Sequence, residues 1–205
     1  MPDRMPAVIS SAVEGIVDEA VVKRLIVETG GNLGPVYGKN GKPHLKKHIN
    51  GYNQAARRIP WMVLLDLNHE FDCAPSLKSA WLQKPSSLMC FRVAVREVEA
   101  WLLADRQRFS SFFQVPLSIV PTDPESIDNP KELIVNLAVR SKSRAIRYDM
   151  VPRLSSGRSI GPGYPSRLIE FAIDGRRGWR PQHAARSSDS LKRCLNHLRE
   201  LAAGE

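Results

Sequence analysis

Four side chains with oxygen ligands each follow an apolar segment of the chain. They are Glu14, Asp66, Asn68 and Glu97. Carboxylate and amide oxygens suit Mg²⁺ or Mn²⁺, and such a cation can position a phosphodiester and lower the pKa of a bound water. A carboxylate beside the metal, here Glu14, could transfer the proton. These residues predict a metal-dependent hydrolytic site, and the alternative is that the acids cap helices or pair with arginines.

The apolar segments that precede these side chains are predicted strands, and helices are predicted between them. Strands that alternate with helices indicate an α/β fold with a mostly parallel sheet. Because the carboxyl ends of parallel strands meet at one edge of a sheet, the four side chains should lie close together there. The predicted strands are residues 7–13, 61–65 and 88–95, and the predicted helices are 18–29, 44–58, 75–82 and 97–105.

Two segments lack a regular apolar period. Residues 30–43 are rich in Gly and are predicted to form a loop or hairpin; they lack the Ser or Thr that ends the phosphate-binding GxxxxGK[ST] motif. Residues 140–165 are rich in Arg, Ser and Gly and are predicted to be irregular. Helices are predicted around them in the last third of the chain, over 131–139, 166–173 and 188–202.

The order of these motifs resembles the Toprim domain of topoisomerases, primases and OLD-family nucleases. VEGIVDEAVVKRL resembles the Toprim glutamate motif as OLD-type nucleases have it, and WMVLLDLNHEFDCAP resembles the DxD motif. This resemblance covers residues 7–110, about half the chain. With REVEAWLLAD and GPGYPSRLIEFA included, the whole chain also resembles a Toprim-like family of bacterial defence loci, whose members often stand beside an ABC-type ATPase.

The resemblance implies Mg²⁺- or Mn²⁺-dependent cleavage of nucleic-acid phosphodiesters in prokaryotic defence, with an ABC-type ATPase as a partner. It makes Glu14 the acid/base or metal-contacting glutamate and Asp66 the main metal ligand, with Glu97 joining from the next strand end. Asp18 either adds to the site or caps its helix. The implied fold is a Toprim-like domain over residues 1–115, with a basic, mainly helical and loop extension over 116–205 packed on it.

One residue departs from the family pattern. Asn68 stands where the motif has its second aspartate, and an amide there lowers the negative charge of the site. Glu70, Asp72 or Glu99 could replace it, although on a helix Glu97 and Glu99, at i and i+2, could not both face the site. The alternative function is therefore a non-catalytic subunit that binds nucleic acid or a partner through a degenerate Toprim site.

The net charge of the chain is concentrated in one region. The 205 residues include 30 Lys and Arg against 21 Asp and Glu, a net charge of +9, which favours a polyanionic partner such as nucleic acid. Residues 140–200 contain fourteen of the cations, twelve of them Arg, against five acids. The difference of nine equals the whole net charge, so the rest of the chain is neutral overall.

Seven basic side chains are predicted to contact nucleic acid. Arg matches the geometry of phosphate, and nothing in the sequence resembles a module that reads bases, so contacts to the backbone are expected. The alternative is a solvated basic surface with some ion pairs. The seven residues are Lys46, Lys47, Arg96, Arg144, Arg147, Arg153 and Arg158.

Several other protein classes are excluded. No apolar segment approaches the roughly 18–20 residues of a membrane span, and the three cysteines form no CxxC pair, which favours free thiols in the cytoplasm. Trp61, Trp81 and Trp101 lie in apolar segments and are predicted core residues. Trp179 lies between arginines, where it could stack on a base or anchor a loop.

Overall fold

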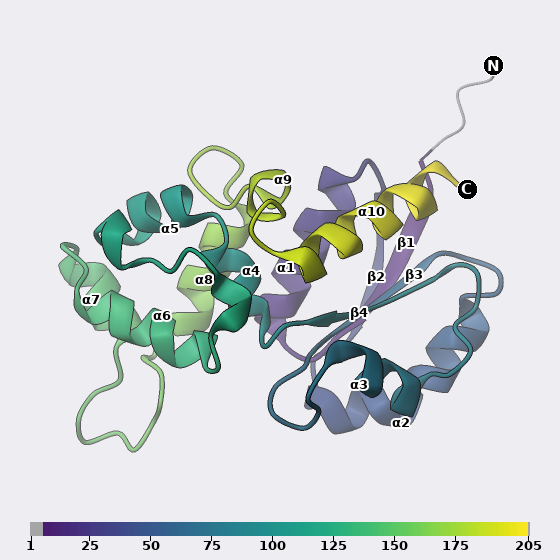
Figure 1. Ribbon diagram of the computed structural model, residues 1–205, viewed down its shortest axis with the longest axis horizontal. Coiled ribbons are helices and arrows are strands. Elements are labelled where there is room, and N and C mark those ends of the chain that lie inside the picture. The colour runs from purple at the N-terminus through teal and green to yellow at the C-terminus, as the bar shows by residue number, and fades with distance from the viewer. Residues whose placement is uncertain (1–5, 205) are drawn as a thin grey trace.

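The computed structural model describes residues 6–204 and contains a four-stranded, all-parallel sheet (Figure 1). The strand order is β2-β1-β3-β4, so β1 and β3 are central. This confirms the predicted α/β class with a parallel sheet. The strands are β1 (Val8–Val13), β2 (Asn32–Gly38), β3 (Trp61–Asp66) and β4 (Met89–Ala94).

Helices follow each strand and make up most of the last half of the chain. In residues 6–204, no helix combines the length and the apolar character needed to cross a membrane. The helices are α1 (Ile16–Glu28), α2 (Gly41–Ala55), α3 (Ala74–Trp81), α4 (Val98–Leu103), α5 (Arg106–Phe113), α6 (Pro130–Val139), α7 (Arg144–Met150), α8 (Tyr164–Ile173), α9 (Pro181–Ala184) and α10 (Asp189–Ala203), with short 3₁₀ turns at Leu117–Ile119 and Pro124–Ser126.

Strand β2 corrects the prediction of a loop or hairpin over residues 30–43. It pairs with β1 at an edge of the sheet, and its side chains are exposed or only half-buried. An edge strand of this kind has no continuous apolar run, which is why the pattern did not indicate it. Its Gly34 packs directly on β1, because a Cβ there would lie 2.8 Å from the carbonyl oxygen of Ile9.

The sheet is covered by helices on both faces, which explains the unbroken apolar run of β3. Met62 and Leu64 lie on the face that packs with α1, α8 and α10. Val63 and Leu65 lie on the opposite face, which α2 and α3 cover (Figure 1). Successive side chains of a strand point to opposite faces, so this single run contributes to both cores.

The last half of the chain extends the first of these two cores. Helices α5 to α8 lie together at one end of the long axis, away from α2 and α3 (Figure 1). The core on the α1 side continues from the sheet into these helices without interruption. Asp105, which is fully buried, accepts hydrogen bonds from the Arg180 backbone N–H and guanidinium at 2.7–3.0 Å. The division of the chain near residue 115 stays a prediction, but the two parts share one hydrophobic cluster.

Helix α7 corrects the prediction that residues 140–165 are irregular. The Ser143 side chain caps the helix by accepting from the Ile146 N–H at 3.3 Å. Ile146 and Met150 are its two buried residues, and one i, i+4 pair is too short a pattern to indicate a helix. The segment that follows, residues 151–163, is a long exposed loop (Figure 1).

Trp179 is a packed loop anchor. Its side chain is fully buried, and its indole N–H donates to the carbonyl oxygen of Trp101 at 2.9 Å. Because the ring has no exposed face, it cannot stack on a base. The predicted core positions of Trp61, Trp81 and Trp101 are confirmed by their burial.

Replacing Trp179 with Phe is expected to lower the free energy of unfolding by about 1–2 kcal/mol, because it removes a buried hydrogen bond. Urea unfolding followed by circular dichroism measures this loss. Trp81→Phe is the matched control, since the Trp81 indole nitrogen is buried without a hydrogen-bond partner. An equal loss in both variants would contradict a role for the Trp179 hydrogen bond.

Candidate carboxylate site at the strand ends

Glu14 and Asp66 meet at the carboxyl ends of the two central strands. Glu14 follows β1, and its Oε1 accepts a hydrogen bond from the Asp66 backbone N–H at 2.9 Å. Asp66 ends β3, and its Oδ1 accepts from the Val98 N–H at the start of α4, at 2.8 Å. The prediction that these two strand ends lie together is therefore met by a direct contact.

Asp18 belongs to the same cluster and also caps its helix. Its Oδ2 accepts a hydrogen bond from the Gly15 N–H at 2.8 Å, so it closes the capping box of α1. The side chain is 6 % exposed, and its charge is close enough to Asp66 to raise the pKa of that carboxyl. The two roles that the sequence left open for Asp18 are combined in one side chain.

Glu99 is a fourth member of the cluster. It is buried, and its Oε1 accepts a hydrogen bond from the Tyr164 hydroxyl of α8 at 3.2 Å. Burial and the Glu99 carboxylate raise the pKa of Tyr164, which keeps this hydroxyl protonated as a donor. The sequence offered Glu99 only as an alternative, and nothing in the sequence indicated Tyr164, which comes from a distant helix.

Glu97 lies against Lys131 at the start of α6. Its Oε2 accepts from the Lys131 backbone N–H at 2.9 Å, and its Oε1 is 3.3 Å from the Lys131 ammonium nitrogen. The same ammonium is 3.8 Å from Glu99 Oε1. Glu97 precedes the helix with extended backbone (φ −136°, ψ 160°), so the helical spacing argument does not apply and both glutamates reach one lysine.

The segment after Asp66 holds Asn68 by its backbone. The Asn68 N–H donates to the Arg96 carbonyl at 2.9 Å, and the Arg96 guanidinium donates to the Asn68 carbonyl at 3.1 Å. Asn68 has a φ of +53°, in the left-handed region that asparagine tolerates well. Arg96, one of the residues predicted to contact nucleic acid, therefore stabilises this loop. Its Nε lies 3.7 Å from Asp128 Oδ1.

The two other acids considered at this loop lie outside the cluster. Glu70 is exposed, and its Oε1 is 3.5 Å from the Lys42 ammonium. Its charge still raises the pKa of Glu14. Asp72 is exposed and lines a different cavity, beside α3. The carboxylates that join Glu14 and Asp66 in the cluster are therefore Asp18 of α1 and Glu99 of α4, and not Glu70 or Asp72.

The crowding of these carboxylates shifts their protonation. Burial raises the pKa of Asp66 well above its usual range, and the charges of Asp18, Glu99 and Glu14 raise it further. Burial, with Glu99 and Glu14, raises the pKa of Asp18 to about 7. The pKa values of Glu14 and Glu99 are also raised, chiefly by burial. Negative charge in excess of the nearby cations favours the binding of a further cation here.

A cavity of about 170 Å³ adjoins the cluster. The acidic residues Asp18, Asp66 and Glu99 line it, together with Lys131. Ile160, from the loop before α8, and Tyr164 and Pro165, at the start of α8, also line the cavity. The loop over residues 151–163 therefore reaches the carboxylate cavity through Ile160.

The donor set suits a hydrated cation bound by few protein ligands. Within residues 6–204, no three His, Cys, Asp or Glu side chains are arranged to hold a metal ion. Mg²⁺ commonly keeps several waters and takes only one or two carboxylates from the protein. Glu14 and Asp66 each use one oxygen to accept a backbone N–H, which leaves the second oxygen of each for a cation. The residues fit Mg²⁺ or Mn²⁺ in this sense.

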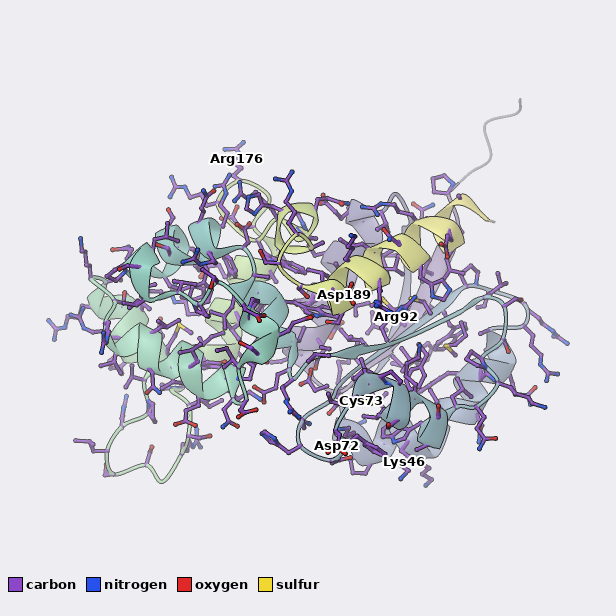
Figure 2. The ribbon with its side chains drawn as sticks, viewed as in Figure 1. Lys46, Asp72, Cys73, Arg92, Arg176 and Asp189 are labelled. Atoms are coloured by element: carbon purple, nitrogen blue, oxygen red, sulfur yellow. The ribbon has the colours of Figure 1, made fainter. Side chains whose placement is uncertain are left out.

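Apart from Arg96, the predicted nucleic-acid residues lie on two separate elements. Lys46 and Lys47 are exposed on α2, and Lys46 lies on the same side of the sheet as α3, well away from α7 (Figures 1 and 2). Lys46 lies over the Trp81 ring at 5.8 Å.

The arginines of α7 and its following loop form the second group. Arg144, Arg147, Arg153 and Arg158 are all exposed. Arg147 donates to the Ser141 carbonyl, and the Arg153 guanidinium donates to the Tyr148 hydroxyl at 2.7 Å. Arg158 belongs to the loop whose Ile160 lines the carboxylate cavity. Helix α2 also begins beside the cluster, where the Gly41 N–H donates to the Glu14 backbone carbonyl at 3.0 Å.

Comparisons with known proteins add no assignment: no family model, no curated protein and no solved structure matches this chain.

Proposed function

We propose that this protein cleaves nucleic-acid phosphodiesters with Mg²⁺ or Mn²⁺ at the carboxylate cluster. The observation that carries the proposal is the gathering of Glu14, Asp18, Asp66 and Glu99 at the carboxyl ends of adjacent parallel strands, with raised pKa values. Such strand ends are where α/β sheets place functional groups. The resemblance of these motifs to the Toprim domain supports the same reaction.

The proposal assigns roles to Asp66 and Glu14 of the cluster and to the neighbouring Lys131. Asp66 and Glu14 hold the cation through the oxygens that accept no backbone N–H. The cation, when bound, lowers the pKa of its water and offsets charge on the phosphate. Glu14 also moves the proton, because burial raises its pKa toward the neutral range where a carboxyl transfers protons best. Lys131 limits the repulsion by its contacts with Glu97 and Glu99.

A nuclease panel on the full chain tests this function. Single- and double-stranded DNA, RNA and tRNA are incubated with Mg²⁺ or Mn²⁺, and parallel reactions contain EDTA. Cleavage of at least one substrate that EDTA abolishes is the expected result. Metal-independent cleavage, or no cleavage of any substrate by protein that binds the metal, would overturn the proposal.

The arginines beside the cavity are proposed to hold the phosphate backbone. Arg153→Gln combined with Arg158→Gln is expected to weaken nucleic-acid binding at low salt and to reduce the slope of log K against log salt by about 1–2. The control is Lys46→Gln with Lys47→Gln, which removes the same charge from α2. Fluorescence anisotropy at several salt concentrations measures both. An equal effect of the two pairs would contradict placement of the strand beside the carboxylates.

A setting in prokaryotic defence, in the cytoplasm and beside an ABC-type ATPase, is also proposed. It is supported by the resemblance of the whole chain to Toprim-like proteins of defence loci. Sequencing of the neighbouring genes, co-expression with an ABC-type ATPase found among them and size-exclusion chromatography test the partner. Co-elution of the two chains is expected, and separate elution would count against this partner.

A second candidate function is a non-catalytic subunit that binds nucleic acid. It is favoured by Asn68 at the second motif position and by the engagement of Glu97 with Lys131. Titration calorimetry with Mg²⁺ and Mn²⁺ separates the two functions. Metal binding that Asp66→Asn removes supports catalysis, whereas nucleic-acid binding without any metal binding supports the subunit.

A further inference from the structure

A second cavity, of about 610 Å³, lies between α3, the free edge of β4 and the start of α10. Cys73, Arg92 and Asp189 surround it, from α3, β4 and α10 respectively (Figure 2). It shares no lining residue with the carboxylate cavity. Its volume is in the range of sites that bind small organic molecules, roughly 300–1,000 Å³.

Most of the charged side chains in this lining are already paired. Arg193 binds Asp189 at 2.7 Å, and Arg96 lies 3.7 Å from Asp128. The Glu125 carboxylate is occupied at the start of α10, where it accepts hydrogen bonds from the Ser188 hydroxyl and the Ser190 N–H, among others. The Glu125 hydrogen bonds hold the start of α10 against the 3₁₀ turn at Pro124–Ser126, and the other two contacts are ion pairs at the surface. None of these groups requires a ligand.

Three charged side chains in the lining form no ion pair among the described residues: the cations Lys78 and Arg92, and the exposed carboxylate Asp72. The Arg92 guanidinium donates to His197 Nδ1 at 2.7 Å, and its Nε is buried without a hydrogen-bond partner. Lys78 forms no ion pair. Burial and the nearby charge of Arg92 lower the pKa of Lys78. Two adjacent cations that repel each other at a cavity wall favour an anionic occupant.

We infer that this cavity binds a phosphate monoester that carries an apolar ring, of about the size of a mononucleotide. A phosphate monoester has a charge of about −1.5 to −2 at neutral pH, which matches Lys78 and Arg92 together, whereas one carboxylate would neutralise only one of them. The guanidinium geometry of Arg92 is suited to phosphate oxygens. The ring has an apolar wall to pack against, formed by Leu67, Pro75, Val93 and Val95.

Titration calorimetry on the full chain tests this site with three probes. AMP contains both the phosphate and the ring, inorganic phosphate lacks the ring, and adenosine lacks the phosphate. We expect AMP to bind more tightly than either of the other two. Absence of AMP binding, or equal binding of adenosine and AMP, would overturn the inference.

Variants then locate the site. Lys78→Gln and Arg92→Gln are each expected to weaken AMP binding about tenfold, the effect of losing one charged hydrogen bond. Lys84→Gln, an exposed lysine just after α3 and outside the lining, is the matched control and should bind AMP as the wild type does. Unchanged binding in both Lys78→Gln and Arg92→Gln would place AMP elsewhere.

This site is independent of the proposed nuclease function. Asp66→Asn, in the other cavity, should leave the affinity for AMP unchanged, and a loss of AMP binding in this variant would overturn the assignment. Circular dichroism spectra and thermal melts of each variant exclude a loss of fold as the cause of weaker binding.

Discussion

Replacing Asp66 with asparagine is expected to reduce metal-dependent cleavage by about 10²–10³-fold, because loss of a metal ligand removes several kcal/mol of transition-state stabilisation. The amide has the same shape as the carboxyl, and its oxygen can still accept the Val98 N–H that Asp66 accepts at 2.8 Å. The substitution therefore removes charge without removing the contact that joins β3 to α4. Initial rates on the best substrate of the panel, with saturating Mg²⁺, measure the change.

Two comparisons separate this effect from a loss of stability. Asp66→Asn relieves repulsion from Asp18, Glu99 and Glu14, so its melting temperature should equal or exceed that of the wild type. Glu97→Gln is the matched acid-to-amide control, and a much smaller loss of rate is expected because Lys131 already engages that carboxylate. Full activity in Asp66→Asn would exclude the proposed metal site.

The strand ends could be predicted because the central strands are buried on both faces. The unbroken apolar run of β3 and the largely apolar segments of β1 and β4 mark the points after which Glu14, Asp66 and Glu97 follow. The edge strand β2 lacks such a run and was missed. The fold class and the meeting of Glu14 with Asp66 thus follow from local patterns, whereas the complete sheet does not.

The rest of the site depends on contacts between distant segments. Lys131 of α6 and Tyr164 of α8 contact Glu99. These residues are distant from Glu99 in the sequence, so no local pattern predicts the contacts. Helical spacing predicted that Glu97 and Glu99 could not both face the site. That prediction is wrong because Glu97 precedes the helix. Residues brought in by tertiary packing are the ones that sequence patterns could not identify.

The basic character of the last third of the chain was also only partly informative. The sequence shows where the arginines are concentrated, but it does not show which of them form ion pairs. Arg180 binds the buried Asp105, and Arg167 binds Asp149 at 2.8 Å, so these two arginines stabilise the fold. Arg153 and Arg158 stay exposed on the loop before α8. The number of arginines available for a phosphate backbone is therefore smaller than the twelve counted in residues 140–200.

Asp18→Asn is expected to stabilise the protein at alkaline pH, by on the order of 4 kcal/mol in the absence of divalent cations. Burial, Glu99 and Glu14 raise the pKa of Asp18 from 3.8 to about 7. The folded state thus holds a proton that the unfolded state releases at lower pH, so stability falls as the pH rises from about 4 to about 7. An asparagine has no proton to release and can still accept the Gly15 N–H.

The difference in the free energy of unfolding between Asp18→Asn and the wild type should change over the same pH range, from about 4 to about 7. It should be small near pH 4, grow up to about pH 7 and stay constant above it. Urea unfolding across this range in EDTA measures it, with Glu132→Gln, an exposed acid on α6, as the control that should show no such trend. A pH-independent difference would mean that Asp18 is already ionised in the folded protein.

The same titration connects stability to the proposed metal site. A cation that binds the ionised cluster stabilises the folded state by RT ln(1 + [L]/Kd) and competes with the proton for the same carboxylates. Mg²⁺ should therefore stabilise the wild type more at pH 8 than at pH 5, and should stabilise Asp18→Asn less at both. Equal stabilisation of the two proteins by Mg²⁺ would show that the cation binds away from Asp18. The electrostatic repulsion among the cluster carboxylates would then not be relieved by a bound metal.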